Sequence, residues 1–207
     1  MKDIFLLGAF AETVELCELC GYHIIGMFDM AVKGELCGYP VLGDDSVAEE
    51  YHKRYPDVPI VIAPDKPVAR KRLFKQYREI GFKMETVISP KAFVSPSAKL
   101  GEGCIVSSFC NISTNCRLGE GVKLNTFANV MHDARIADYV TIAPNAVILG
   151  YITIGEGAYI GANSTILQTH SIGENSTVGA GAVVTKDVVS DEVVVGVPAK
   201  RIRGKKE

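Results

Sequence analysis

An aliphatic residue recurs every six positions from Ile88 to Val184, and this repeat limits the fold more than any other feature of the sequence. All 17 positions of the series are Ile, Leu or Val. Two residues before each one the side chain is usually small, as at Ala128 and Ala134. Two inward positions separated by one outward residue show the alternation of a β-strand, so each repeat contains a short strand.

A second regularity of the repeat concerns the residue three positions after each aliphatic one. Gly, Asn and Asp recur there, and these residues tolerate left-handed backbone angles best. The positions are Gly103, Asn115, Gly121, Asp133, Asn145, Gly157, Asn163, Asn175, Gly181 and Asp187. Each repeat is therefore expected to be a strand followed by a corner. Three such faces give a coil of about 18 residues, and the repeats predict a parallel β-helix of between about five and six coils.

Residues 1–87 lack the repeat and alternate strand-like with helix-like segments. Alternation of this kind predicts a small parallel α/β domain, Rossmann-like in type, whose ligands bind at the carboxyl ends of the strands. The expected strands are 3–9, 22–29 and 58–63, and the expected helices are 11–21, 45–55 and 68–81. The sequence thus predicts two domains, residues 1–87 and residues 88–207, the second ending in a C-terminal cap.

Composition excludes several classes of function. The net charge is −2, which does not indicate nucleic-acid binding, and no apolar run approaches a membrane span. Six cysteines without an export signal predict reduced thiols and a cytoplasmic location. The spacing Cys17-x-x-Cys20 falls on an expected helix and indicates an apolar helix face. The basic residues of segment 70–78 are expected to be mostly a solvated face, with one or two able to meet a phosphate.

The stretch ANVMHDARIADY places His132 and Asp133 at a corner of the predicted β-helix. From the residues alone two interpretations stay open for His132: a polar side chain tolerated at an exposed corner, or a catalytic group. Asp133 has a similar alternative, because it occupies the position where Gly, Asn and Asp recur for backbone reasons. His170, the other repeat histidine, stands where small inward residues are usual, and a local bulge or a polar contact would each explain it.

The whole chain resembles the bacterial nucleotide-sugar acyltransferases, which include the acetyltransferases of bacillosamine and perosamine synthesis and the sialic-acid O-acetyltransferases. The segments LNTFANVMHDARIADYVTIAPNAVILG, PVLGDD and GVPAK carry the resemblance. It implies left-handed coiling, a homotrimer with acyl-CoA bound between neighbouring β-helices, and a role in bacterial polysaccharide or glycan biosynthesis. It also implies that residues 1–87 bind the nucleotide-sugar and that residues 88–207 carry out acyl transfer.

The resemblance assigns the catalytic positions residue by residue. His132 falls at the general base, and Asp133 falls where an acidic residue raises the basicity of that histidine. Asn125 matches an asparagine near the histidine. Gly150 matches the glycine whose backbone N–H faces the developing oxyanion and the acyl-CoA.

The resemblance also implies two sets of binding residues. The acyl-CoA contacts are Thr141, Gly150, Ala162 and Ala180. The nucleotide-sugar contacts are Gly8, Ala9, Phe10, Asp29, Met30, Asp65 and Arg70. Three features depart from the family pattern. The turn at Ala11-Glu12-Thr13 lacks the usual Gly-His-Gly, Met30 replaces a frequent second aspartate, and Pro64 precedes Asp65 where a glycine is expected.

The expected function is therefore acetyl-CoA-dependent N-acylation of the amino group of a nucleotide-linked amino-sugar. His132 would act as general base in direct attack on the thioester, and an imidazole suits that task because its unperturbed pKa is about 6.5. No metal is expected. O-acetylation of a sugar hydroxyl is the nearest alternative. A zinc hydratase needs three histidine ligands, whereas the repeat holds only His132 and His170. A non-catalytic trimeric scaffold is the remaining class.

Overall fold

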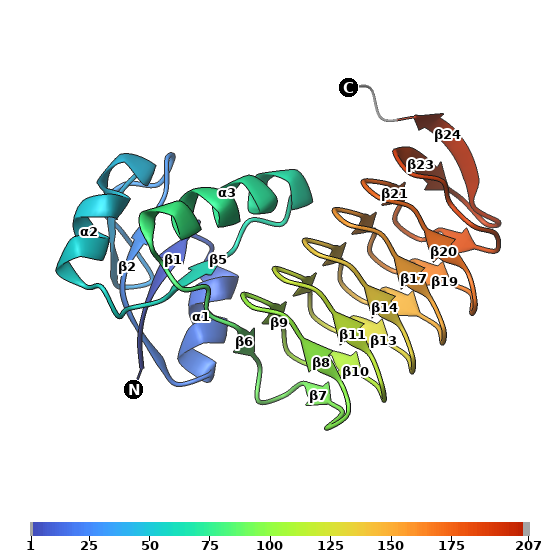
Figure 1. The fold of residues 1–207 in the computed structure, drawn as a ribbon, viewed down its shortest axis with the longest axis horizontal. Coiled ribbons are helices and arrows are strands. Elements are labelled where there is room, and N and C mark those ends of the chain that lie inside the picture. Colours follow the sequence, from blue (N-terminus) through green and yellow to red (C-terminus); the bar gives the residue numbers. More distant parts are fainter. Residues whose placement is uncertain (1, 205–207) are drawn as a thin grey trace.

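The computed structural model describes residues 2–204, and it consists of an α/β part followed by a long stack of triangular coils (Figure 1). Within the described residues, no helix combines the length and the apolar character that crossing a bilayer requires. The predicted fold class is confirmed: a Rossmann-like sheet precedes a left-handed parallel β-helix.

The α/β part is built on a five-stranded sheet in the order β3-β4-β2-β1-β5. Strands β1, β2, β4 and β5 are parallel, and only β3 runs antiparallel to β4. The strands are β1 (Lys2–Leu7), β2 (Tyr22–Phe28), β3 (Glu35–Leu36), β4 (Tyr39–Gly43) and β5 (Ile60–Ile62). The β3–β4 hairpin is absent from the sequence prediction, which expected three strands.

Helices cover both faces of this sheet, because successive side chains of a strand point to opposite faces. Phe5 and Leu7 of β1 pack toward α2 and α3, whereas Ile4 and Leu6 pack toward α1. The helices are α1 (Ala11–Leu19), a 3₁₀ turn η1 (Asp45–Val47), α2 (Ala48–Arg54) and α3 (Pro67–Ile80). The three expected helices are confirmed.

The β-helix has three faces, each a sheet of two-residue strands stacked in parallel. Face 1 contains β6 (Val87–Ile88), β9 (Ile105–Val106), β12 (Lys123–Leu124), β15 (Thr141–Ile142), β18 (Tyr159–Ile160) and β21 (Thr177–Val178). Face 2 contains β7 (Phe93–Val94), β10 (Asn111–Ile112), β13 (Asn129–Val130), β16 (Val147–Ile148), β19 (Thr165–Ile166) and β22 (Val183–Val184). Face 3 contains β8 (Lys99–Leu100), β11 (Arg117–Leu118), β14 (Arg135–Ile136), β17 (Thr153–Ile154) and β20 (Ser171–Ile172).

The repeat positions fill the interior as predicted, except that Ile88, the first of the series, is exposed. The aliphatic residues and the small residues before them form one continuous core, in which Val130, Ile136, Ala128 and Ala134 are almost completely buried. The inward thiols are buried. Burial raises the pKa of the Cys110 thiol to about 11.

The corners follow the predicted left-handed rule with two differences. Phe109, Phe127, Tyr139, Tyr151 and Thr169 also adopt positive φ angles, so the corner accepts bulky residues that the Gly/Asn/Asp rule misses. The prediction of a left-handed corner at Asp187 is wrong, because Asp191 rather than Asp187 has a positive φ angle in the last coil. The Asp187 carboxylate instead accepts a hydrogen bond from the Ser171 N–H at 2.9 Å.

The C-terminal segment closes the top of face 1. Strand β23 (Glu192–Val195) continues the parallel stack, and β24 (Lys200–Gly204) pairs with it in antiparallel fashion. The last three residues, 205–207, lie outside the described residues.

Candidate active site at the corners of the β-helix

His132 lies at the corner between β13 and β14, where faces 2 and 3 meet. Its side chain is 46% exposed, and its Nδ1 lies 3.0 Å from Oδ2 of Asp133. Asp133 adopts a φ of 58°, and its other carboxylate oxygen accepts a hydrogen bond from the Asn115 amide at 3.3 Å. With the Nδ1 proton donated to Asp133, Nε2 keeps a lone pair that is free to accept a proton.

Gly150 lies one coil above His132 and leaves room for the imidazole. A Cβ atom built on Gly150 would lie 2.6 Å from Cε1 and 2.8 Å from Nε2 of His132. The Gly150 N–H donates no hydrogen bond within residues 2–204, and Gly150 itself is buried with the imidazole packed against it. The ring of Tyr151 packs edge-on against the imidazole, with 5.2 Å between the ring centroids. Nε2 of His132 and an unpaired backbone donor therefore lie side by side.

Substitution Gly150→Ala tests this close approach. The new methyl group would push the imidazole away from its position, and displacement of a catalytic group by about 1 Å costs roughly 100-fold in rate. We expect kcat for acyl transfer to fall by about that factor while the melting temperature stays close to the wild-type value, because His132 is partly exposed and free to move. Steady-state kinetics and calorimetry measure both quantities. Full activity in the variant would contradict the role given to this contact.

Asn125 does not lie near His132 in the same chain. It lies at the corner between faces 1 and 2, and its amide donates to Asp65 at a distance of 3.4 Å. Ala162 and Ala180 lie at this same corner, one and two turns of the coil beyond Pro144. Their N–H groups also have no acceptor among the residues that the structure describes. The proposed catalytic and acyl-CoA positions thus divide between two corners.

Two predicted binding residues are buried instead of facing a ligand. Arg70 is 0% exposed and Thr141 is 0% exposed, because both lie between α3 and the β-helix. The Arg70 guanidinium donates to the carbonyls of Pro64, Asp65, Gly121, Tyr139 and Val140 and to the hydroxyl of Thr141. The Thr141 hydroxyl donates to the Asp65 carbonyl at 2.6 Å. In this structure the side chains of Arg70 and Thr141 therefore make contacts within the chain, whereas the sequence predicted a contact with the nucleotide-sugar for Arg70 and with acyl-CoA for Thr141.

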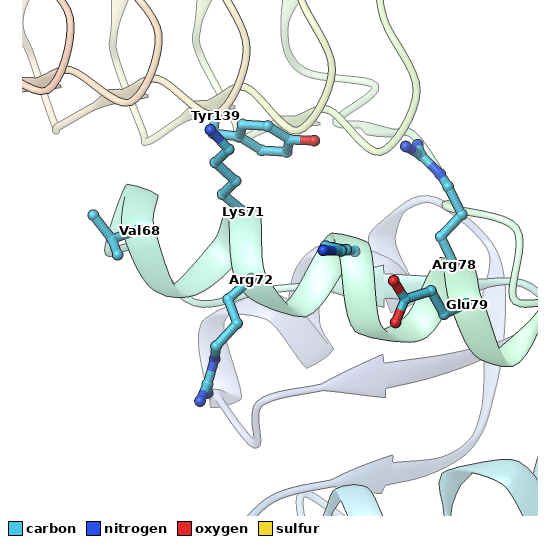
Figure 2. Close-up of a pocket in the computed structure, with 7 residues that line it drawn as sticks. Val68, Lys71, Arg72, Arg78, Glu79 and Tyr139 are labelled. Atoms are coloured by element: carbon cyan, nitrogen blue, oxygen red, sulfur yellow. The ribbon is translucent and has the colours of Figure 1, made fainter.

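Other basic residues of α3 also hold the two parts together. Lys71 pairs with Glu156, and Arg78 pairs with Glu120 at 2.8 Å. Figure 2 shows Lys71 and Arg78 directed toward the coils and Arg72 directed away from them. The residues around the adjoining cavity of about 630 Å³ are Val68, Lys71, Arg72, Lys75, Arg78, Glu79 and Tyr139. The expectation of a mostly solvated basic face is confirmed, because Lys71 and Arg78 stay exposed while they pair with the coils and only Arg70 is buried.

The predicted nucleotide-sugar residues at the ends of β1 and β2 come together. Gly8, Phe10, Asp29 and Met30 line one cavity of about 190 Å³. The Asp29 carboxylate accepts hydrogen bonds from the backbone N–H groups of Ala9, Ala31 and Val32 at 2.8–2.9 Å. Burial acts to raise the pKa of Asp29, but these three donors outweigh it and hold the pKa below its usual range.

Sequence reasoning did not single out two cations near these cavities. Arg72 lines the cavity of Gly8 and Asp29, whereas the prediction chose Arg70 from the same helix. Lys123 bonds the Ala63 carbonyl and the Asp65 carboxylate, both at 2.7 Å, and lines a second cavity of about 330 Å³ with Asp65. Lys123 occupies an outward position of face 1, beneath the α/β part. The register of the repeat predicts that position, so the sequence contained a signal for this residue.

His170 does not form a bulge. Its Nδ1 lies 3.3 Å from the Asp187 carboxylate, which accounts for its polar character by a contact inside the last coil. Between residues 2 and 204, no three His, Cys, Asp or Glu side chains gather as a metal-ligand set.

Comparison with known proteins places this geometry among bacterial transferases. The bacterial transferase hexapeptide model (six repeats) matches residues 115–150, and the hexapeptide repeat of succinyl-transferase matches residues 151–186. No curated protein sequence matches the chain. PerB from Caulobacter crescentus, solved with CoA and GDP-perosamine, is 28% identical, with a TM-score of 0.92 and 98% of each chain covered.

Two further structures match over nearly the full length. The acetyltransferase domain of PglB from Neisseria gonorrhoeae is 30% identical, with a TM-score of 0.91, over 98% of this chain and 100% of that domain. GDP-perosamine N-acetyltransferase from Caulobacter crescentus, with one histidine replaced by alanine and with CoA and GDP-perosamine bound, is 28% identical, with a TM-score of 0.93 and 98% of each chain covered. The chain therefore belongs to the bacterial nucleotide-sugar acyltransferases of the hexapeptide-repeat superfamily.

Proposed function

We propose that this enzyme transfers an acetyl group from acetyl-CoA to the amino group of a nucleotide-linked amino-sugar. The observation that carries the proposal is the contact between His132 and Gly150, where a proton acceptor adjoins a free backbone donor. The bound ligands of the matching structures, CoA and GDP-perosamine, support this choice of substrates.

The proposed chemistry needs only these groups and good alignment. Acetyl-CoA supplies a thioester carbonyl that the sugar amine attacks directly. Nε2 of His132 accepts the proton that the amine loses, and Asp133 stabilises the resulting imidazolium. The Gly150 N–H donates a hydrogen bond to the oxygen that becomes negative, a contribution of roughly 3 kcal/mol in comparable sites. The carbon–sulfur bond then breaks, and the CoA sulfur takes the proton back from the imidazolium of His132, so that CoA leaves as a thiol and the base is regenerated.

The two parts of the chain receive different substrates in this proposal. Residues 1–87 hold the nucleotide-sugar in the cavity lined by Gly8, Phe10, Asp29 and Met30. Residues 88–207 carry out acyl transfer, with the free N–H groups of Ala162 and Ala180 donating to the arm of acyl-CoA. Asn125 and Asp65, whose side chains are hydrogen-bonded to each other, contribute to the active site at the corner between faces 1 and 2.

We also propose a homotrimer with each active site between two copies. Its support is the separation of His132 from Asn125, Ala162 and Ala180, which lie at different corners of one chain. A second copy can bring the two corners together. Six free cysteines agree with a cytoplasmic enzyme, and the substrate class with the biosynthesis of a bacterial glycan.

One assay tests the reaction and the substrate class together. Thiol release from acetyl-CoA is measured against a panel of UDP-, GDP- and dTDP-linked amino-sugars, each beside its hydroxyl counterpart. We expect turnover with at least one amino-sugar and an N-acetylated product by mass spectrometry. Turnover on the hydroxyl counterparts alone would establish O-acetylation instead, and absence of turnover on the whole panel would count against catalysis of this kind.

A further inference from the structure

A row of exposed cations crosses face 3 of the β-helix. Lys99, Arg117 and Arg135 occupy the outward position of three successive strands and are aligned directly with one another. Adjacent strands lie about 4.8 Å apart, and like charges directly opposite each other destabilise a sheet. Within residues 2–204, none of the three has a carboxylate within 4.0 Å. This basic ladder is therefore an uncompensated surface in one chain.

A row of exposed carboxylates runs along helix α1. Glu12, Glu15 and Glu18 lie on the solvent side, since the opposite side of the helix buries Val14 and Cys17 among other residues. Steps of three residues advance about 4.5 Å along a helix. None of the three glutamates forms an ion pair with a described residue, and Glu18 only accepts a hydrogen bond from the Tyr39 hydroxyl. This acidic row is the counterpart of the basic ladder in number, spacing and charge.

The surface beside the ladder has the shape to receive a helix. A shallow groove of about 300 Å³ runs over β11, β14 and β17. Gly119 and Ala137, each two residues after an arginine of the ladder, form part of its lining, so a helix can approach the sheet closely beside the ladder. Leu19, which is 41% exposed at the end of α1, supplies an apolar side chain for such a groove.

We propose that helix α1 of a second copy lies along face 3, with its acidic row against the basic ladder. The proposal rests on the homotrimer of the proposed function and names the surfaces that meet in it. Helix α1 and face 3 are different surfaces, so the contact is heterologous, and repetition around an axis closes a ring.

This contact also explains how the divided site is completed. The His132 corner borders face 3 directly, and α1 borders a cavity of about 410 Å³ that contains Glu12, Glu15 and Asn125. A helix seated on face 3 therefore brings the Asn125 corner of its own chain beside the His132 corner of the other. Assembly and activity depend on the same contact.

Charge reversal tests the contact without any substrate. In the double variant Arg117→Glu/Arg135→Glu, glutamates of two copies face each other, and we expect assembly to weaken by at least about 100-fold, since opposed like charges are strongly unfavourable. The variant Glu12→Lys/Glu15→Lys should weaken assembly to a similar extent. The combined variant with all four reversals should regain the assembled mass. Light scattering and native mass spectrometry over a concentration series give the masses.

The control is Lys53→Glu/Lys83→Glu, which changes the net charge equally at two exposed lysines of the α/β part. It should assemble normally. A wild-type monomer, or an assembled Arg117→Glu/Arg135→Glu protein with the wild-type mass, would overturn the proposal. The proposal would also be overturned if the Arg117→Glu/Arg135→Glu protein kept the wild-type mass but lost binding to phosphatidylglycerol vesicles. That result would assign the basic ladder to a membrane. An assembled wild type that is inert on every amino-sugar would defeat the proposed function alone.

Discussion

Substitution His132→Asn is expected to lower kcat for acetyl transfer by about 100- to 10,000-fold, the usual contribution of a positioned general base. Asparagine is close to histidine in size and polarity, but its side chain has no basic nitrogen. The amine must then lose its proton to water while it attacks the thioester. Because His132 is a corner residue with a 46% exposed side chain, the core of the β-helix does not depend on it. The melting temperature and the KM for the nucleotide-sugar should therefore change little.

The matched control is His170→Asn. His170 is the other repeat histidine, and it pairs with Asp187 at 3.3 Å as His132 pairs with Asp133 at 3.0 Å. If the effect at His132 reflected only the loss of a histidine–aspartate pair, both variants would lose activity equally. We expect His170→Asn to retain at least about half of the wild-type kcat. Steady-state kinetics of the two variants under identical conditions decide the matter, and a fully active His132→Asn enzyme would remove His132 from the mechanism.

The β-helix could be predicted from the sequence because each repeat determines its own local structure. An inward aliphatic residue, a small partner and a left-handed corner recur on one chain, and stacking repeats them at every level. The neighbourhood of His132 and Gly150 follows from the same arithmetic, since residues 18 positions apart pair directly, as Asn129 and Val147 do. The corners with aromatic residues were not predicted, because tertiary packing, as in the stacked rings of Phe109 and Phe127, overrides the backbone preference at these positions.

Contacts between the two parts of the chain could not be predicted in this way. The α3 sequence shows five basic residues, and helical periodicity places Arg70 on the same face as Leu73, Phe74 and Tyr77, but it does not show what that face packs against. The burial of Arg70 depends on how α3 docks against corners of the β-helix some 50–70 residues later in the sequence. The short β3–β4 hairpin was missed for a related reason, since its polar two-residue strand β3 has no alternation of its own and depends on pairing with β4.

Substitution Arg70→Met should destabilise the protein by about 4 kcal/mol, because it leaves carbonyl groups of both parts buried without a donor. Burial lowers the pKa of Arg70 to about 10, so the guanidinium stays charged at neutral pH and its hydrogen bonds are charge-assisted. Arg70→Lys should recover only part of the loss, since one ammonium group cannot reach carbonyls as widely separated as those of Pro64, Gly121 and Tyr139. Urea denaturation followed by circular dichroism measures the change.

The matched variant Arg72→Met separates structural from binding roles on the same helix. Arg72 is exposed, makes no ion pair with a described residue and lines the cavity of Gly8 and Asp29. Its loss should leave the free energy of unfolding within about 0.5 kcal/mol of wild type, as is usual for surface substitutions. It should raise the KM for the nucleotide-sugar, because a cation beside the phosphates is lost. The reverse pattern, a stable Arg70→Met protein with a raised KM, would return the substrate contact to Arg70, where the family resemblance first placed it.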